Sequence, residues 1–85
     1  MIIHVSRQFE KQYKKLPKTI QHQAQIKEEI FRGNPFHPVL RTHKLQGKEK
    51  EAWAFWINYS YRVTFIFLSE KEVLFFEVGT HAIYR

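Results

Sequence analysis

The fold is decided by the stretch AWAFWINYSYRVTFIFLSEKEVLFFEV, residues 52–78. It holds three runs of aromatic and β-branched residues, which favour extended backbone because their side chains pack well on a pleated surface. The runs cover residues 53–57, 61–68 and 73–78, and the polar segments between them have the length of hairpin turns. We therefore expect three antiparallel strands. The runs are nearly continuous rather than alternating, which indicates a sheet covered on much of both faces.

The residues before this stretch have the periodicity of helices. Phe9 and Tyr13 fall on one apolar helical stripe, and Pro17 ends that helix and can open a second one, which stops at Gly33. The β-branched run at Ile2–Val5 can add a short strand. The sequence therefore predicts an α+β fold in which an N-terminal helical hairpin packs on a small antiparallel sheet.

Length and composition set the class of protein. The 85 residues leave room for one domain, residues 1–85, because a second core would need roughly 50 residues of its own. Apolar residues make up 44% of the chain, too many for a disordered protein. The longest stretch without a charged residue, 52–61, is about half the length of a membrane-spanning helix. The start of the chain turns polar at Ser6, too early for a signal peptide, so we expect a cytoplasmic location.

The charge balance indicates a polyanionic partner. Fourteen Lys and Arg residues oppose eight acidic residues, all of them Glu, and the formal net charge is +6. Nucleic acid is the polyanion most often bound by a small basic domain. The alternative is a basic domain without any nucleic-acid role, in which the charge serves solubility alone.

Isolated polar residues in or beside the strands are the candidates for chemistry. Arg62 lies inside an apolar run, so its guanidinium either pairs with Glu77 of the next strand or faces an anion such as phosphate. His81 closes the third strand, and His43 lies in a basic loop. Histidine serves as acid or base near neutral pH. The chain therefore holds the residue types that RNA cleavage through the 2′-hydroxyl requires.

We expect neither a metal ion nor a cofactor. The five histidines lack the close spacing of a zinc site, and the absence of cysteine removes thiolate ligands and thiol nucleophiles. The three glycines are isolated, so no glycine-rich phosphate loop is present.

Short motifs in a characteristic order carry a family resemblance. They are Phe9-x3-Tyr13-Lys14-Lys15-Leu16-Pro17, Gly33-Asn34-Pro35, Leu40-Arg41-x-His43-x-Leu45-x-Gly47, Tyr61-Arg62-Val63 and Gly79-Thr80-His81. Together they span the chain, and their order resembles that of the RelE/ParE superfamily of bacterial type II toxin–antitoxin systems. Within that superfamily the chain is most similar to the RelE-like and YafQ-like messenger-RNA interferases.

The resemblance implies an activity and its residues. It implies a ribosome-dependent, metal-independent endoribonuclease that cuts messenger RNA in the ribosomal decoding site, held inactive by a cognate antitoxin from the adjacent gene. His43 matches the histidine before Leu-x-Gly in YafQ-like members, Arg62 the phosphate-stabilising strand arginine, and His81 the catalytic histidine after Gly-Thr. We expect His43 to act as base and His81 as acid.

Other residues are predicted to hold the substrate. They are Lys44, Lys48, Lys50, Tyr84 and Arg85, with support from Lys11, Lys14, Lys15 and Lys18. The lysines would contact phosphates, and the aromatic ring would stack on an unpaired base. For the lysines before residue 20 a solvated helix face is the stronger alternative.

Two points keep other functions open. YafQ-like enzymes carry a further histidine and an aspartate in the central hairpin, where this chain has Trp56 and Ser60. ParE-type relatives share the fold and inhibit DNA gyrase without cutting RNA, so the fold alone does not select the function. A gyrase inhibitor and a catalytically inactive nucleic-acid-binding or protein-binding module are therefore the alternatives.

Overall fold

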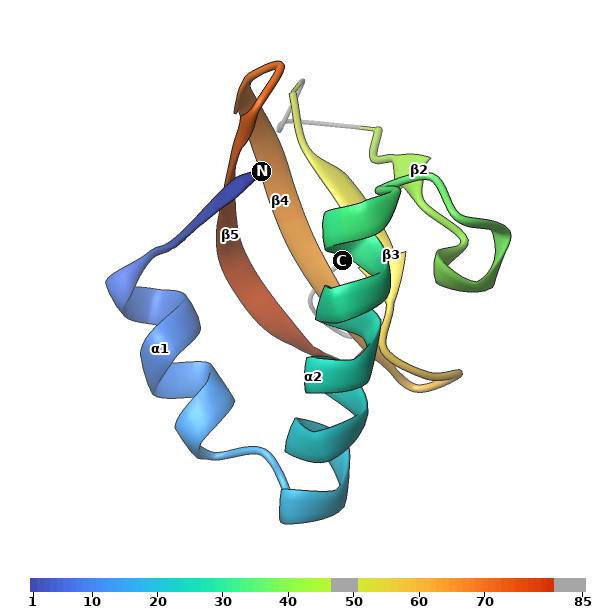
Figure 1. The fold of residues 1–85 in the computed structure, drawn as a ribbon. Helices are drawn as coiled ribbons and strands as arrows, with labels where there is room; N and C mark the ends of the chain where they lie inside the picture. The colour runs from blue at the N-terminus through green and yellow to red at the C-terminus, as the bar shows by residue number, and fades with distance from the viewer. Residues whose placement is uncertain (47–50, 81–85) are drawn as a thin grey trace.

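The computed structural model describes residues 1–46 and 51–80. Along the chain they form β1 (Ile2–Val5), α1 (Arg7–Lys14), α2 (Lys18–Gly33), the 3-10 helix η1 (Pro38–Leu40), β2 (His43–Lys44), β3 (Trp53–Trp56), β4 (Tyr61–Ser69) and β5 (Glu72–Thr80) (Figure 1). The helical hairpin, the three main strands and the N-terminal strand are confirmed. No helix in this described part of the chain is long and apolar enough to cross a membrane.

The strands form one sheet in the order β1-β5-β4-β3-β2. Its three-stranded centre is antiparallel as predicted, and β2 extends it antiparallel at the β3 edge. At the other edge β1 runs parallel to β5, with Ile3 opposite Val73, so the complete sheet is mixed. The strands of a parallel pair must be joined by a crossover connection, and here everything from α1 to β4 lies between the two strands in the sequence.

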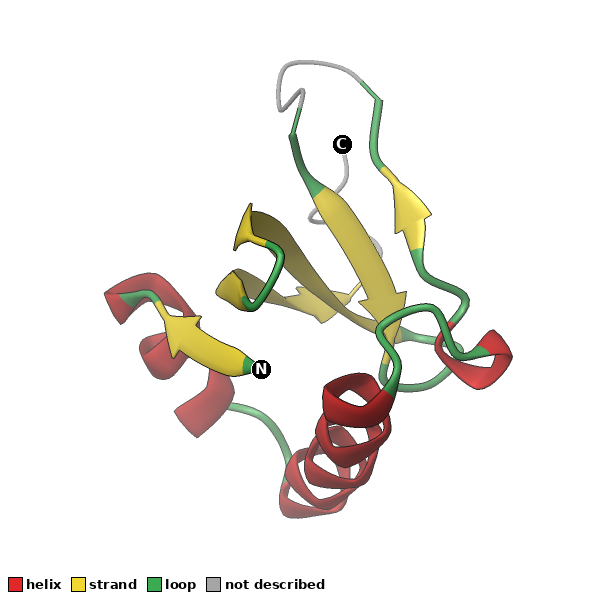
Figure 2. Cartoon of the chain, turned by 45° about the horizontal axis from the view of Figure 1, so that its top comes forward, coloured by secondary structure: helices red, strands yellow, loops and turns green. Residues whose placement is uncertain are grey.

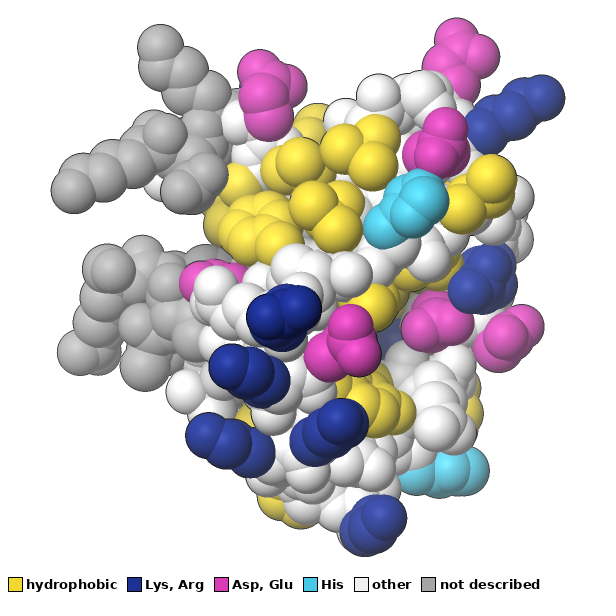
Figure 3. Space-filling model, turned by 90° about the vertical axis from the view of Figure 1, so that its left-hand side faces the viewer, with side chains coloured by type: hydrophobic (Ala, Val, Ile, Leu, Met, Phe, Trp, Pro, Cys, Tyr) yellow, Lys and Arg dark blue, Asp and Glu magenta, His cyan; other side chains and the backbone are white. Residues whose placement is uncertain are grey.

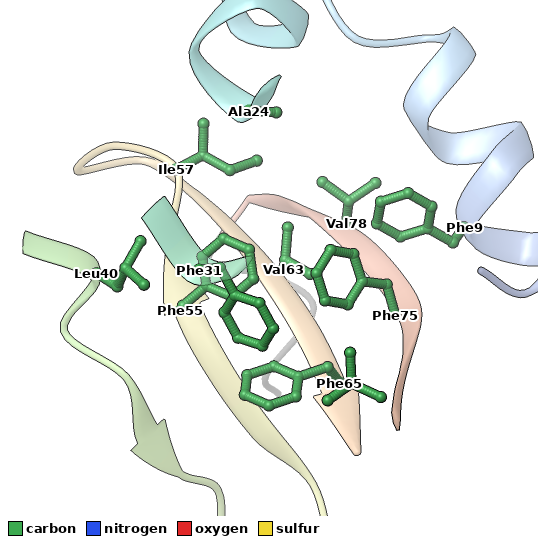
Figure 4. Packing of buried hydrophobic residues seen from close by; sticks show 11 residues of the cluster. Phe9, Ala24, Phe31, Leu40, Phe55, Ile57, Val63, Phe65, Phe75 and Val78 are labelled. Carbon is green, nitrogen blue, oxygen red and sulfur yellow. The ribbon is translucent and has the colours of Figure 1, made fainter. Parts of the chain in front are cut away.

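The hydrophobic core lies between the helices and one face of the sheet. Phe31 of α2 is fully buried at its centre (Figure 4). Its ring centroid lies 5.0 Å from those of Phe55 and Phe65 and 5.3 Å from that of Phe75. Because side chains alternate along a strand, the residues directly before and after each of the strand phenylalanines point to the opposite face of the sheet.

Helix α1 covers the edge of β5 beyond the end of β1. Its N-cap Ser6 accepts a hydrogen bond from the Phe9 N–H at 3.0 Å and donates one to the Phe76 carbonyl at 3.1 Å. Further along, Gln12 Oε1 accepts the Val78 N–H at 2.8 Å. An uncovered sheet edge leaves backbone groups unpaired, and these side chains satisfy them. Helix α1 and β2 are thereby placed at opposite edges of the sheet (Figure 2).

Candidate functional site

Cross-strand register gathers polar side chains on the face of the sheet opposite the helices, which we call the far face. One row holds His43 of β2, Ala54 of β3 and Thr64 of β4, which lie directly opposite one another. In the next row Trp56 lies opposite Arg62. Residues opposite one another in an antiparallel pair share a face. Side chains from three strands therefore lie on one surface, and His43 and Arg62 are the predicted candidates among them.

Arg62 is the most buried charge on the far face. It is 2% exposed, and its Nη1 donates hydrogen bonds to the carbonyls of Asn58 and Tyr59, both at 2.7 Å, and of Tyr61 at 3.3 Å. Its guanidinium carbon lies 3.9 Å from the ring centroid of Trp56. A buried charge requires such compensation, because burial removes its hydration. The guanidinium is thereby fixed against the turn between β3 and β4.

Of the two partners expected for Arg62, the carboxylate of Glu77 is engaged elsewhere. The β4–β5 register places Glu77 opposite Thr64, whereas Arg62 lies opposite Gly79. Glu77 Oε1 accepts a hydrogen bond from Gln8 Nε2 of α1 at 3.1 Å. The carboxylate is therefore directed to the β5 edge, away from the carbonyls that accept hydrogen bonds from Arg62.

Arg41 brings a second guanidinium to the same indole. Its guanidinium carbon lies 4.5 Å from the Trp56 ring centroid, and the residue is exposed. Arg41 is the one described non-glycine residue with a positive φ, at 51° with ψ 39°. This left-handed conformation costs about 1–2 kcal/mol for a residue with a side chain. A cation over tryptophan recovers roughly 0.5–2 kcal/mol, so the contact offsets much of the strain.

His43 is exposed on β2, and its Nδ1 lies 2.9 Å from the carbonyl oxygen of Arg41. Arg62 lies two strands away, a separation of about 10 Å across the sheet, so the two side chains share the far face without being neighbours. The site therefore holds an exposed imidazole and, over one indole, the guanidinium groups of Arg41 and Arg62.

Thr64 lies on the far face two residues after Arg62 on β4, and its hydroxyl has an unusual environment. The residue is 3% exposed, and its Oγ1 is buried without a hydrogen-bond partner within residues 1–46 and 51–80. Burying a hydroxyl unpaired costs about 1–3 kcal/mol. One reason for a protein to keep such a group is a role in binding or catalysis.

Comparisons with known proteins bear on this geometry. No family model and no curated relative matches the chain. Solved structures, in contrast, do match the chain. YafQ from E. coli strain BL21(DE3) superposes with a TM-score of 0.79 at 24% identity, over 95% of this chain and 93% of that chain. The YoeB/ParE toxin from Agrobacterium tumefaciens gives 0.80 at 12% identity, over 95% and 99%. A chain of the E. coli DinJ–YafQ toxin–antitoxin complex gives 0.77 at 24%, over 95% and 92%. The chain has the RelE/ParE toxin fold.

On this RelE/ParE fold the predicted site residues fall into two groups. His43 and Arg62 share the far face, whereas Lys44 lies opposite Trp53 and therefore points to the other face. Five further predicted residues lie outside the described part of the chain, namely Lys48, Lys50, His81, Tyr84 and Arg85.

The supporting lysines of the hairpin form a separate surface of the RelE/ParE fold. They are Lys11, Lys14, Lys15 and Lys18, and all are exposed. Figure 3 shows Lys and Arg side chains gathering on the side of the molecule that α1 occupies. Because α1 packs on β5 and His43 lies on β2, these lysines are at the opposite edge of the sheet from His43.

Sequence reasoning missed the roles of Arg41 and Trp56. Trp56 was considered only as a departure from YafQ-like enzymes, together with Ser60, which is exposed in the turn after β3. For Arg41 the sequence indicates only a place in the basic loop and in the motif before His43. The spacing of Arg41 from His43, and of Trp56 from Ala54, was a usable signal, because residues two apart share a face if the segment is extended. The left-handed turn at Arg41 had no signal in the sequence.

Proposed function

We propose that the chain is the toxin of a type II toxin–antitoxin system and that it cleaves messenger RNA on the ribosome without a metal ion. The observation that carries the proposal is the far face, which holds one exposed histidine and two guanidinium groups that share one indole, on a sheet of the RelE/ParE fold. Histidine and arginine supply acid–base catalysis and phosphate stabilisation, the two requirements of RNA cleavage.

In the proposed reaction His43 removes the proton of the 2′-hydroxyl beside the scissile phosphate. The 2′-oxygen bonds to phosphorus, the bond from phosphorus to the 5′-oxygen breaks, and a 2′,3′-cyclic phosphate forms. The 5′-oxygen leaves with a proton from an acid, a role that we assign to His81. The negative charge that develops on the phosphate oxygens is stabilised by Arg62, whose fixed guanidinium requires no reorganisation during the reaction.

A cognate antitoxin is part of the proposal. One of the similar structures is described as a DinJ–YafQ toxin–antitoxin complex. By this likeness we expect a small, largely acidic protein encoded by the adjacent gene to bind the basic toxin, whose net charge of +6 favours an acidic partner. Both proteins would act in the cytoplasm, where the ribosomes are. Co-expression with that neighbour should yield a complex that co-purifies, and its absence would count against the assignment.

The cleavage experiment uses purified protein on programmed ribosomes under single-turnover conditions. Wild type should cut the messenger RNA in EDTA and only when ribosomes are present. His43→Gln should reduce the rate about 10²–10⁴-fold. The matched control is His4→Gln, because His4 is also exposed but binds Glu72 at the β1 edge, away from the far face.

The alternatives give different results in the same experiment. One similar structure is a YoeB/ParE toxin, so inhibition of DNA gyrase with intact messenger RNA would select a ParE-type function. Neither cleavage nor gyrase inhibition would leave a catalytically inactive nucleic-acid-binding or protein-binding module. Equal rates for His43→Gln and wild type would refute the proposed role of His43.

A further inference from the structure

The strained turn at Arg41 is held by contacts on both sides. The Arg41 N–H donates to the Pro38 carbonyl at 3.2 Å and closes η1. The Arg41 guanidinium lies over Trp56, and the neighbouring Thr42 hydroxyl donates to the Pro35 carbonyl. A left-handed non-glycine residue persists only where its surroundings over-determine it. The backbone direction after Arg41 is therefore fixed rather than incidental.

This backbone direction determines which nitrogen of the His43 ring carries the hydrogen. The Arg41 carbonyl oxygen lies 2.9 Å from His43 Nδ1. A carbonyl oxygen only accepts, so Nδ1 must donate and must carry a hydrogen. In the neutral ring the lone pair is then on Nε2. An imidazole in water has the opposite preference, with the hydrogen more often on Nε2.

We propose that Arg41 is a positioning residue, which selects the Nδ1–H tautomer of His43 through its left-handed backbone and so makes Nε2 the basic nitrogen. The use of Nε2 to accept the 2′-hydroxyl proton rests on the proposed function. The tautomer itself is a property of the free protein and does not depend on RNA. The inference separates two parts of Arg41, since the carbonyl orients the imidazole while the guanidinium anchors the turn on Trp56.

Two substitutions separate the backbone of Arg41 from its side chain. Arg41→Gly removes the guanidinium but keeps the left-handed conformation accessible, because glycine adopts positive φ without a steric penalty. Arg41→Val also removes the guanidinium, and its β-branched side chain strongly disfavours positive φ. Both variants lose the same charge, so a difference between them reports on the backbone.

The test measures the nitrogen-15 chemical shifts of the His43 ring at a pH where the ring is neutral, with the signals assigned by their loss in His43→Gln. Wild type and Arg41→Gly should show the hydrogen on Nδ1, and Arg41→Val should shift toward the Nε2–H form. An Nε2–H tautomer in wild type would overturn the proposal, as would an unchanged Nδ1–H tautomer in Arg41→Val. If Arg41→Val fails to fold, Arg41→Ala takes its place, because alanine also lacks the guanidinium and is strained at positive φ, and the wild-type measurement tests the tautomer itself.

Cleavage kinetics then test the link to the proposed function. Arg41→Val should cleave about 10-fold or more slowly than Arg41→Gly in kcat, with a smaller effect on KM, because it misplaces a base without changing charge. Equal kcat values in the two variants, with different tautomers, would refute the catalytic use of Nε2. Absence of cleavage by wild type would refute the proposed function and leave the tautomer result standing.

Discussion

Replacing Thr64 by valine should stabilise the protein. The two side chains have nearly the same shape, and the substitution exchanges a buried hydroxyl for a methyl group on a strand where valine is favoured. Because Thr64 Oγ1 is buried without a partner in residues 1–46 and 51–80, its removal relieves a desolvation cost of about 1–3 kcal/mol. We expect Thr64→Val to raise the free energy of unfolding by about 1–2 kcal/mol. In a domain of this size each kcal/mol raises Tm by about 4–8 °C.

Urea denaturation followed by circular dichroism measures this change, and a thermal scan provides the Tm. Thr80→Val is the matched control, since Thr80 is exposed on β5 and the same exchange there should be nearly neutral. Thr64→Ser keeps the hydroxyl and loses the methyl group, so it should be less stable than wild type. A loss of 1 kcal/mol or more in Thr64→Val would show that the hydroxyl is hydrogen-bonded in the folded protein, and the reasoning would be wrong.

Three further predictions concern the core, the sheet edge and the proposed chemistry. Phe31→Ala should lower the free energy of unfolding by about 3–5 kcal/mol in urea titrations, because it empties the centre of the core; a loss below 1 kcal/mol would contradict the packing. Gln12→Met should cost about 1–3 kcal/mol by leaving the Val78 N–H without an acceptor, whereas Gln12→Glu keeps an acceptor and should cost less; equal losses would refute this account. On ribosomes the cleavage rate should follow a bell-shaped pH profile. A base acts only when deprotonated, so the residual rate of His43→Gln should lose the acidic limb, and an unchanged profile would assign the base elsewhere.

The sequence predicts the fold wherever an apolar pattern continues over most of a helix or strand. The stripe from Phe9 to Tyr13 and the aromatic runs after residue 52 each cover most of the element in which they lie, and burial of their apolar faces determines the result. The segment 34–46 gave no such pattern. Strand β2 has two residues, too few for alternation to appear, and its position follows from pairing with β3. The parallel direction of β1 likewise depends on residues about 70 positions away.

The sequence predicts which residue types the candidate site contains, but not how they are arranged in space. His43 and Arg62 were named because histidine and arginine carry the proposed chemistry, but their common face depends on the register of three strands. For the guanidinium of Arg62 the sequence predicts either Glu77 or an anion as partner, and it gives no indication of the three backbone carbonyls that accept from it. Backbone groups are acceptors at every residue, so a sequence contains no mark of the ones that a buried cation will use.

The pairing of β1 with β5 has a consequence for synthesis of the protein. Residues 2–5 leave the ribosome early, but their partners, residues 72–75, are added near the opposite end of the described chain. Helix α1 also packs on β5 and has its edge contacts there. Contacts of such high sequence separation form late, so one whole edge of the sheet stays open until residue 75 has emerged. The nascent chain therefore cannot complete the β1–β5 edge of its native sheet before residue 75 has been synthesised.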